Sequence, residues 1–160
     1  MSFVRPARGF TMIELLIVMA IVGVLAAVFI TNYPGAQRRS RDSIRRSDLK
    51  QFQTALETYA NRNNGFYPIR ATAVKPNTMC GGANPLGFIA TCPNDPKDTL
   101  NQCTGGTCQY QYITDANGTS YGIWARLEYP AVSANMFYIV CSTGVTKEGS
   151  TVPTTGNTCP

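Results

Sequence analysis

Hydrophobic residues are concentrated in one unbroken run near the start of the chain. From Phe10 to Ile30 the sequence carries a single charged residue, Glu14. A helix of about 20 residues spans roughly 30 Å, the thickness of the hydrocarbon core of a bilayer. The pattern therefore predicts a membrane-spanning helix over residues 10–33, preceded by a short basic segment over residues 1–9. The run is too long for a cleaved secretory signal, and no small-residue cleavage site follows it.

Helical periodicity continues beyond this run to about residue 64. Pro34 and Gly35 fall between the two halves, where proline removes one backbone hydrogen bond and predicts a kink. Beyond them an apolar stripe is expected to pack on the rest of the chain, with charged residues on the opposite faces. Asn64 and Gly65 can cap the helix end, and Pro68 prevents its continuation. The stripe comprises Ile44, Leu49, Phe52, Leu56 and Tyr59, and the charged faces carry Arg38, Arg41, Asp42, Arg45, Asp48 and Glu57.

The C-terminal part, residues 65–160, shows the two-residue alternation typical of strands. Residues 109–114, 121–128 and 136–141 are predicted strands, and residues 145–147 have weaker strand character. Gly and Pro are dense in residues 69–108, which predicts loops. A long helix packed on a small antiparallel sheet is an α+β architecture.

Six cysteines lie in this C-terminal part and none in the apolar run. An even number in a loop-rich region predicts a disulfide framework formed in an oxidising compartment. The sequence alone permits 15 pairings; local closure would join Cys80 to Cys92, Cys103 to Cys108 and Cys141 to Cys159. Zinc is disfavoured because the sequence has no histidine and no Cys-x-x-Cys pair.

The remaining composition argues against an enzyme. Without histidine, Ser-His and Cys-His dyads are excluded, and no phosphate-binding or dinucleotide-binding glycine motif occurs. The carboxylates of the C-terminal part are too scattered along the sequence to predict a catalytic pair: Asp95, Asp98, Asp115 and Glu128. Asp115, Asn117 and Gly118 match a fragment of a calcium loop without its closing glutamate, so a turn is the favoured interpretation. No cofactor and no metal are predicted.

Glu14 is the residue of the apolar run that requires an explanation. A carboxylate in a membrane helix costs on the order of 2.5–3.5 kcal/mol at the bilayer centre and less near the interface. Glu14 either reaches the head-group region or meets a cation at the same depth. Cleavage between Gly9 and Phe10 would create such a cation, because the new α-amine could neutralise the Glu14 of a neighbouring subunit.

The residues around Glu14 resemble a known processing signal. The sequence Arg8-Gly9-Phe10-Thr-Met-Ile-Glu14 followed by an apolar run is similar to the class III signal of type IV pilins and type II secretion pseudopilins. The resemblance implies cleavage after Gly9 by a prepilin peptidase, N-methylation of Phe10, and a role for Glu14 in subunit recognition and register. It also implies a single-pass precursor in the inner membrane with its N-terminus in the cytoplasm. A count of positive charges alone favours the opposite orientation, since arginines at 38, 39, 41, 45 and 46 follow the run.

Two further segments resemble the same family. Residues 55–68 are similar to the helix end and Gly-x-Tyr-Pro turn of many pilins and G-type pseudopilins, and residues 110–128 resemble their sheet more loosely. The resemblance implies a structural subunit of a type IV pilus, a homopolymer built by an assembly platform and its ATPase for adhesion or motility. The cysteines favour a surface pilus over a periplasmic pseudopilin, which stays an alternative.

A DNA-binding minor or competence pilin, or a membrane-anchored receptor, is the second class considered. The basic residues 38–46 could bind phosphates or anionic lipids, but local pairing with Asp42 and Asp48 is favoured. A nucleic-acid-binding domain would also need concentrated positive charge. The basic residues of the C-terminal part are instead spread out, at Arg70, Lys75, Lys97, Arg126 and Lys147.

Overall fold

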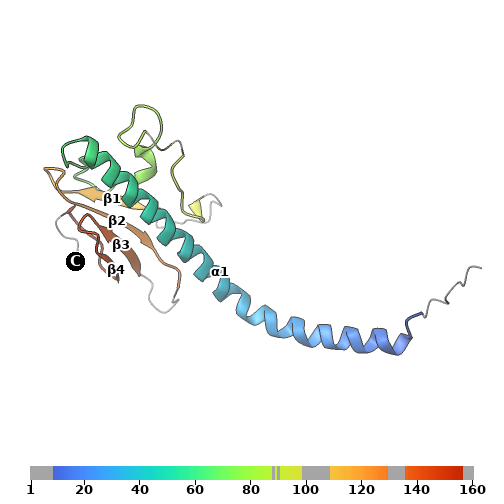
Figure 1. The fold of residues 1–160 in the computed structure, drawn as a ribbon. Helices are drawn as coiled ribbons and strands as arrows, with labels where there is room; N and C mark the ends of the chain where they lie inside the picture. Colours follow the sequence, from blue (N-terminus) through green and yellow to red (C-terminus); the bar gives the residue numbers. More distant parts are fainter. Residues whose placement is uncertain (1–8, 88, 90, 99–108, 130–135, 157–160) are drawn as a thin grey trace, which may run out of the picture. The chain divides into compact units, whose positions relative to one another are not determined.

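The computed structural model describes residues 9–87, 89, 91–98, 109–129 and 136–156, without the side chains of residues 28–32. The chain begins with one helix, α1 (Met12–Arg62), and continues through a short 3-10 helix, η1 (Pro76–Met79). Four strands follow: β1 (Gln111–Thr114), β2 (Tyr121–Arg126), β3 (Phe137–Cys141) and β4 (Thr146–Gly149) (Figure 1). The α+β class is therefore confirmed. The chain divides into two compact units, Met1–Gln37 and Arg38–Pro160.

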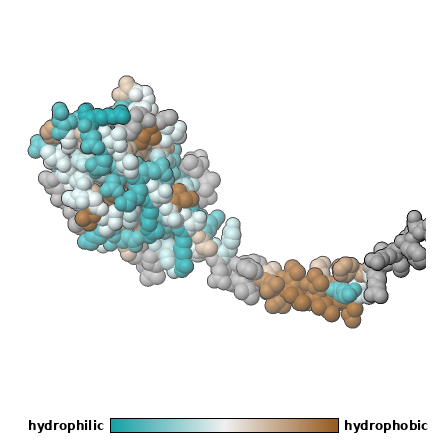
Figure 2. Space-filling model, in the orientation of Figure 1, coloured by the Kyte–Doolittle hydropathy of each residue, from teal (hydrophilic) through white to brown (hydrophobic). Residues whose placement is uncertain are grey.

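The first unit consists, in its described part, of the beginning of α1. Each side chain from Met12 to Ala27 is exposed in the single chain, and Figure 2 shows the apolar surface that they form. Among the described residues, no helix meets the length and hydropathy expected of a membrane span. The helix continues through Pro34 and Gly35, so this pair does not end it, and the kink expected there stays a prediction.

Helix α1 ends as the sequence indicates. Asn64 and Gly65 adopt positive φ angles of 56° and 85°. The Gly65 amide donates to the carbonyl of Ala60 at 2.8 Å, which satisfies a carbonyl that the helix leaves without a partner. The observed last helical residue, Arg62, lies two positions before the predicted end.

The sheet is an antiparallel meander with the order β1-β2-β3-β4. The three strongly predicted strands are present, each somewhat shorter than expected, and the weak signal at 145–147 corresponds to β4. One edge of the sheet is covered, because Val74 and Tyr112 exchange two backbone hydrogen bonds of 2.8 and 2.9 Å.

The main hydrophobic core lies between α1 and one face of the sheet. Leu49, Phe52 and Leu56 of the helix are fully buried against side chains of the sheet and of the loop that precedes it. The contributing sheet and loop residues are Met79, Leu86, Tyr110, Tyr112, Tyr121, Ile123, Ala125 and Val140.

The opposite face of the sheet holds a second apolar cluster. Trp124 of β2 is only 6% exposed and packs with Ile113, Ile139 and Cys141. Successive side chains of β2 therefore point to opposite faces of the sheet, and both faces are buried. The chain after β4 returns to the turn between β1 and β2, since a Cβ on Gly156 would lie 2.1 Å from the carbonyl oxygen of Ser120.

The predicted Cys80–Cys92 disulfide is confirmed, with the two Cα atoms 5.9 Å apart. It closes a loop between η1 and β1. Cys141 is also disulfide-bonded. Its predicted partner Cys159, like Cys103 and Cys108, lies outside the described residues.

Candidate functional site

Thr11 and Glu14 close a reciprocal pair of hydrogen bonds at the start of α1. The Thr11 amide and hydroxyl donate to Glu14 Oε2 at 2.9 and 2.8 Å, and the Glu14 amide donates to Thr11 Oγ1 at 3.3 Å. This is a capping box, which satisfies amides that have no partner within the helix. Thr11 is thus a partner of Glu14 besides the two expected ones, the head groups and a neighbouring amine, and Thr-x-x-Glu is the sequence signal for this cap.

The predicted processing position lies just outside the helix. Gly9, Phe10 and Thr11 precede its first residue, and Phe10 is 86% exposed. Nothing lies within 4 Å of where a Cβ on Gly9 would be. The Gly9–Phe10 peptide bond is thus exposed and lies outside the hydrogen-bonded helix.

The beginning of α1 exposes a large apolar surface. Its large side chains are between 51% and 87% exposed in the single chain. Soluble monomers rarely leave so continuous an apolar surface in water, which indicates that lipid or other protein chains cover it. The residues are Met12, Ile13, Leu15, Leu16, Ile17, Val18, Met19, Ile21, Val22, Val24 and Leu25.

Within the second unit, the inward face of α1 begins with charges rather than apolar side chains. Asp42, Arg45 and Asp48 are 1%, 1% and 8% exposed, whereas Ile44 is 45% exposed. The prediction that these three charged residues lie on solvent-facing sides, with Ile44 in the packed stripe, was wrong. The spacing of three residues places all three in line with Phe52 of the core.

Arg45 is the centre of a buried ionic cluster. Its Nε and Nη2 donate to the two carboxylate oxygens of Asp95 at 2.6 and 2.9 Å. Its Nη1 lies 2.8 Å from Asp42 Oδ1 and 2.7 Å from Glu128 Oε1. Burial opposes the charge, but the bonds to Asp95, Asp42 and Glu128 hold the pKa of Arg45 above its usual value. Together the three carboxylates occupy the Nε, Nη1 and Nη2 donors of Arg45, and such pairing offsets the cost of burying its charge.

Glu128 joins two further cations, Arg41 and Lys97, to this cluster. Arg41 donates to both of its oxygens at 2.9 and 2.7 Å, and the Lys97 ammonium lies 3.1 Å from Oε2. Burial works to raise the pKa of Glu128, but hydrogen bonds from Arg41, Lys97 and Arg45 lower it to about 2. Asp42 accepts the backbone amides of Glu128 and Tyr129 at 2.9 to 3.1 Å. The segment after β2 is therefore attached to α1 through both backbone and side chains.

Two other acids of α1 pair with tyrosines rather than with arginines. The Tyr110 hydroxyl donates to Asp48 Oδ2 at 2.5 Å, while burial raises the pKa of Asp48. Glu57 accepts hydrogen bonds from Tyr67 at 3.0 and 3.2 Å and from Tyr121 at 3.2 Å. The predicted pairing of Asp48 with the arginines was thus wrong, and Glu57 lies toward the sheet rather than opposite it.

The arginine-rich segment is largely occupied by contacts within the chain. Besides Arg41 and Arg45, Arg46 pairs with Glu148 of β4 at 2.6 Å. Arg39 lies over the ring of Tyr129, 4.3 Å from its centroid. Local pairing, the favoured interpretation, is confirmed for Asp42, but most partners come from distant parts of the sequence.

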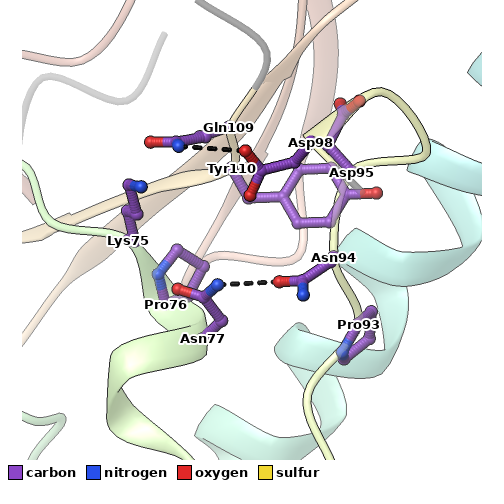
Figure 3. Close-up of a pocket in the computed structure, with 9 residues that line it drawn as sticks. All are labelled: Lys75, Pro76, Asn77, Pro93, Asn94, Asp95, Asp98, Gln109 and Tyr110. Carbon is purple, nitrogen blue, oxygen red and sulfur yellow. Dashed lines mark hydrogen bonds between the residues drawn. The ribbon is translucent and has the colours of Figure 1, made fainter. Parts of the chain in front are cut away.

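A small open hollow lies where the disulfide loop meets the start of β1. Figure 3 shows Asn77 and Asn94 facing one another across it, with an Nδ2 to Oδ1 distance of 2.7 Å, and Gln109 donating to Asp98 at 3.2 Å. No group of His, Cys, Asp and Glu in the described ranges could hold a metal ion. The Asp115 carboxylate accepts bonds from Thr119 and Ser120 within its own turn.

Comparison with known proteins gives a consistent set of relatives. Residues 4–30 match the prokaryotic N-terminal methylation motif. The chain is 32% identical over 111 residues to the type IV wide pilus major component PilA4 of Thermus thermophilus, covering 69% of this chain and 85% of that protein. It is 42% identical over 59 residues to the type IV major pilin protein PilA of Myxococcus xanthus, covering 37% and 27%.

A relative from a secretion system is also matched. The chain is 33% identical over 99 residues to the type II secretion system core protein G of Pectobacterium carotovorum, covering 58% of this chain and 63% of that protein. The chain therefore spans less than two thirds of the Myxococcus and Pectobacterium proteins. No solved structure is matched.

Proposed function

Because the chain belongs to the family of type IV pilins and type II secretion pseudopilins, we propose that it is a structural subunit of a type IV pilus. The role is assembly rather than catalysis. The observation that carries the proposal is the combination of the methylation-motif match over residues 4–30 with an exposed apolar surface on the same stretch of α1.

The proposed subunit is made as a precursor anchored in the inner membrane by residues 10–33, with its N-terminus in the cytoplasm. A prepilin peptidase removes residues 1–9 and methylates Phe10. The accessible bond between Gly9 and Phe10 supports this step. The assembly platform and its ATPase then move the subunit into the filament, where contacts among the apolar helices replace contacts with lipid, and the kink at Pro34 and Gly35 lets the helix adapt.

Glu14 would set the register between neighbouring subunits. In the single chain its carboxylate is already held by Thr11, at 2.8 and 2.9 Å. A carboxylate can accept further hydrogen bonds. The α-amine of a neighbouring Phe10 could therefore bind Glu14 without breaking the cap, and the pair would be strong in apolar surroundings, where an unpaired charge is costly.

The globular unit would form the outer layer of the filament, closed by disulfides. We propose that Cys141 pairs with Cys159 and Cys103 with Cys108. Support for the first pair comes from Gly156, which adjoins Ser120, and from the Ser142 amide, which donates to the carbonyl of Tyr121 at 3.1 Å. The chain near residue 156 thus lies close to the strand that carries Cys141, and three residues can span about 10 Å.

The alternative within the family is a type II secretion pseudopilin, favoured by the similarity to core protein G. The pilus is preferred because the match to the Thermus pilus component covers 85% of that protein. Nucleic-acid binding by residues 38–46 is less favoured, because Arg41, Arg45 and Arg46 pair with acids of the same chain.

Mass spectrometry of protein from sheared cell surfaces and from membranes tests the proposal. A chain beginning at methylated Phe10, six hydrogens lighter than its fully reduced form and abundant in the sheared fraction, is the expected result. A processed chain found only in membranes would favour the pseudopilin. A chain still beginning at Met1 would contradict assembly through the proposed signal.

A further inference from the structure

The loop between α1 and the sheet is cross-linked at its base. The Cys80–Cys92 disulfide joins residues 12 positions apart. Just outside it, Asn77 donates to Asn94 at 2.7 Å, so that the two ends of the loop run side by side, as Figure 3 shows. The disulfide and this hydrogen bond together hold the two ends of the loop close to one another.

The chain leaving this loop supplies two members of the buried ionic cluster. Asp95 follows Cys92 by three residues, is 3% exposed and binds Arg45 through both oxygens. Lys97 lies two residues further along the chain, and its ammonium is 3.1 Å from Glu128 Oε2. The Lys97 amide also donates to Asp95 at 2.9 Å, which orients the carboxylate. Arg45 keeps only Asp42 and Glu128 if this segment moves away.

We propose that the Cys80–Cys92 disulfide and the Arg45–Asp95 ion pair form a redox-coupled clamp, in which oxidation of the cysteines secures Asp95 on the buried guanidinium. In the oxidation, the two thiols lose two electrons and two protons to the disulfide of a thiol–disulfide oxidoreductase through a mixed disulfide. In the reduced chain the cysteines no longer cross-link the loop, so the loop can adopt more conformations. Holding Asp95 in place then costs more conformational entropy.

The coupling makes the stability of the globular unit depend on oxidation of the two cysteines. Without Asp95 the charge of Arg45 is still paired at Nη1, but its buried Nε and Nη2 lose their acceptor, which is unfavourable. The globular unit therefore reaches its full stability only after exposure to an oxidising compartment. This inference goes beyond the proposed filament role and does not depend on it, because it concerns the stability of a single chain.

The coupling must be reciprocal. If the disulfide strengthens the Arg45–Asp95 pair, the pair stabilises the disulfide by the same free energy. Removing the charge of Asp95 should then make Cys80–Cys92 easier to reduce. We expect about a tenfold shift in the reduction equilibrium, which for two electrons corresponds to about 30 mV.

The test uses the full-length chain in detergent micelles, equilibrated with graded ratios of reduced to oxidised dithiothreitol. Free thiols are alkylated, and the peptides that contain Cys80 and Cys92 are quantified by mass spectrometry. Asp95→Asn is compared with Asp98→Asn, a matched control on the same segment whose carboxylate binds Gln109 instead of Arg45. Only Asp95→Asn should move the midpoint toward easier reduction.

An unchanged midpoint for Asp95→Asn overturns the proposal, and so does an equal shift for Asp98→Asn. If Asp95→Asn fails to fold, Arg45→Lys serves as the second variant, since it keeps the positive charge but loses the two-point contact with Asp95. A shift in the same direction supports the clamp, and a midpoint at the wild-type value contradicts it.

Discussion

Arg45 and Asp95 lie 50 residues apart in the sequence, yet their side chains meet through two hydrogen bonds of 2.6 and 2.9 Å in the interior. The contact joins the middle of α1 to the loop closed by Cys80 and Cys92. Each side chain is 2% exposed, so neither charge has water as an alternative partner. The pair therefore joins the disulfide loop to the helix, beside the apolar contacts that Met79 and Leu86 make in the main core.

Arg45→Ala should lower the free energy of unfolding by about 3–5 kcal/mol, because it leaves the buried Asp95 carboxylate without its main partner. Arg46→Ala is the matched control, since Arg46 and Glu148 are 39% and 43% exposed and such pairs contribute about 0–1 kcal/mol. Urea unfolding of the full chain in detergent, followed by fluorescence of Trp124, the single tryptophan, measures both. Equal losses would show that the cluster contributes no more than a surface pair.

The stability of the globular unit should depend on pH through Glu128. Its pKa falls from 4.5 to about 2 in the folded state, mainly through Arg41, Lys97 and Arg45 acting against burial. A lowered carboxyl pKa stabilises the fold fully above the unfolded value, and that stabilisation is lost as the pH falls from about 4.5 toward 2. Asp48, whose pKa is raised, contributes in the opposite direction.

Urea midpoints measured between pH 6 and pH 2, conditions chosen to bracket both states of the carboxyl group, check this dependence. Glu128→Gln should be less stable than wild type at pH 6 and should lose less stability on acidification. Identical pH profiles for the two proteins would contradict the assignment of Glu128 as a stabilising carboxylate.

Phe52→Ala should cost about 3–5 kcal/mol, the range for removing a fully buried aromatic side chain. Ile44→Ala should change stability by less than about 0.5 kcal/mol, because Ile44 is 45% exposed on the same helix. The same unfolding assay distinguishes the two faces. A large loss of unfolding free energy for Ile44→Ala would instead show that Ile44 belongs to the packed stripe, as the sequence alone predicts.

Much of the fold follows from local patterns. The helix, its end at Asn64 and Gly65, and the strands are specified by periodicity and turn residues that act over a few positions. The Cys80–Cys92 pair could be predicted because the two cysteines close a short loop.

The buried ionic cluster could not be predicted in this way. Asp42, Arg45 and Asp48 have the correct spacing for the packed face, but burying a charge is unfavourable unless its partners are known. Those partners, Asp95, Glu128 and Tyr110, come from segments 50 to 86 residues distant. The cap formed by Thr11 is different, since its sequence signal is local.

Thr11→Ala should reduce the yield of sheared filaments, because it removes the hydroxyl that binds Glu14 and leaves the carboxylate less well oriented for a neighbour. Loss of an N-cap side chain costs about 1 kcal/mol. Thr11→Ser keeps the hydroxyl and should assemble as wild type does. Immunoblots of sheared and membrane fractions provide the measurement, with N-terminal sequencing to verify that processing is intact. Equal filament yields for the alanine and serine variants would rule out a role for the cap in assembly.

Gly156→Ala should destabilise the globular unit, because its Cβ would lie 2.1 Å from the carbonyl oxygen of Ser120 and 2.5 Å from the amide nitrogen of Asp115. Both neighbours are backbone atoms of the turn between β1 and β2, so the chain after β4 would have to move away, at a cost of about 1–3 kcal/mol. Gly149→Ala is the control, since nothing lies within 4 Å of its added Cβ.

If the chain near Gly156 holds Cys159 beside Cys141, Gly156→Ala should also increase alkylation of Cys141 under mild reduction, whereas Gly149→Ala should not. Wild-type stability in both variants would show that the contact of Gly156 with the turn does not contribute to the fold.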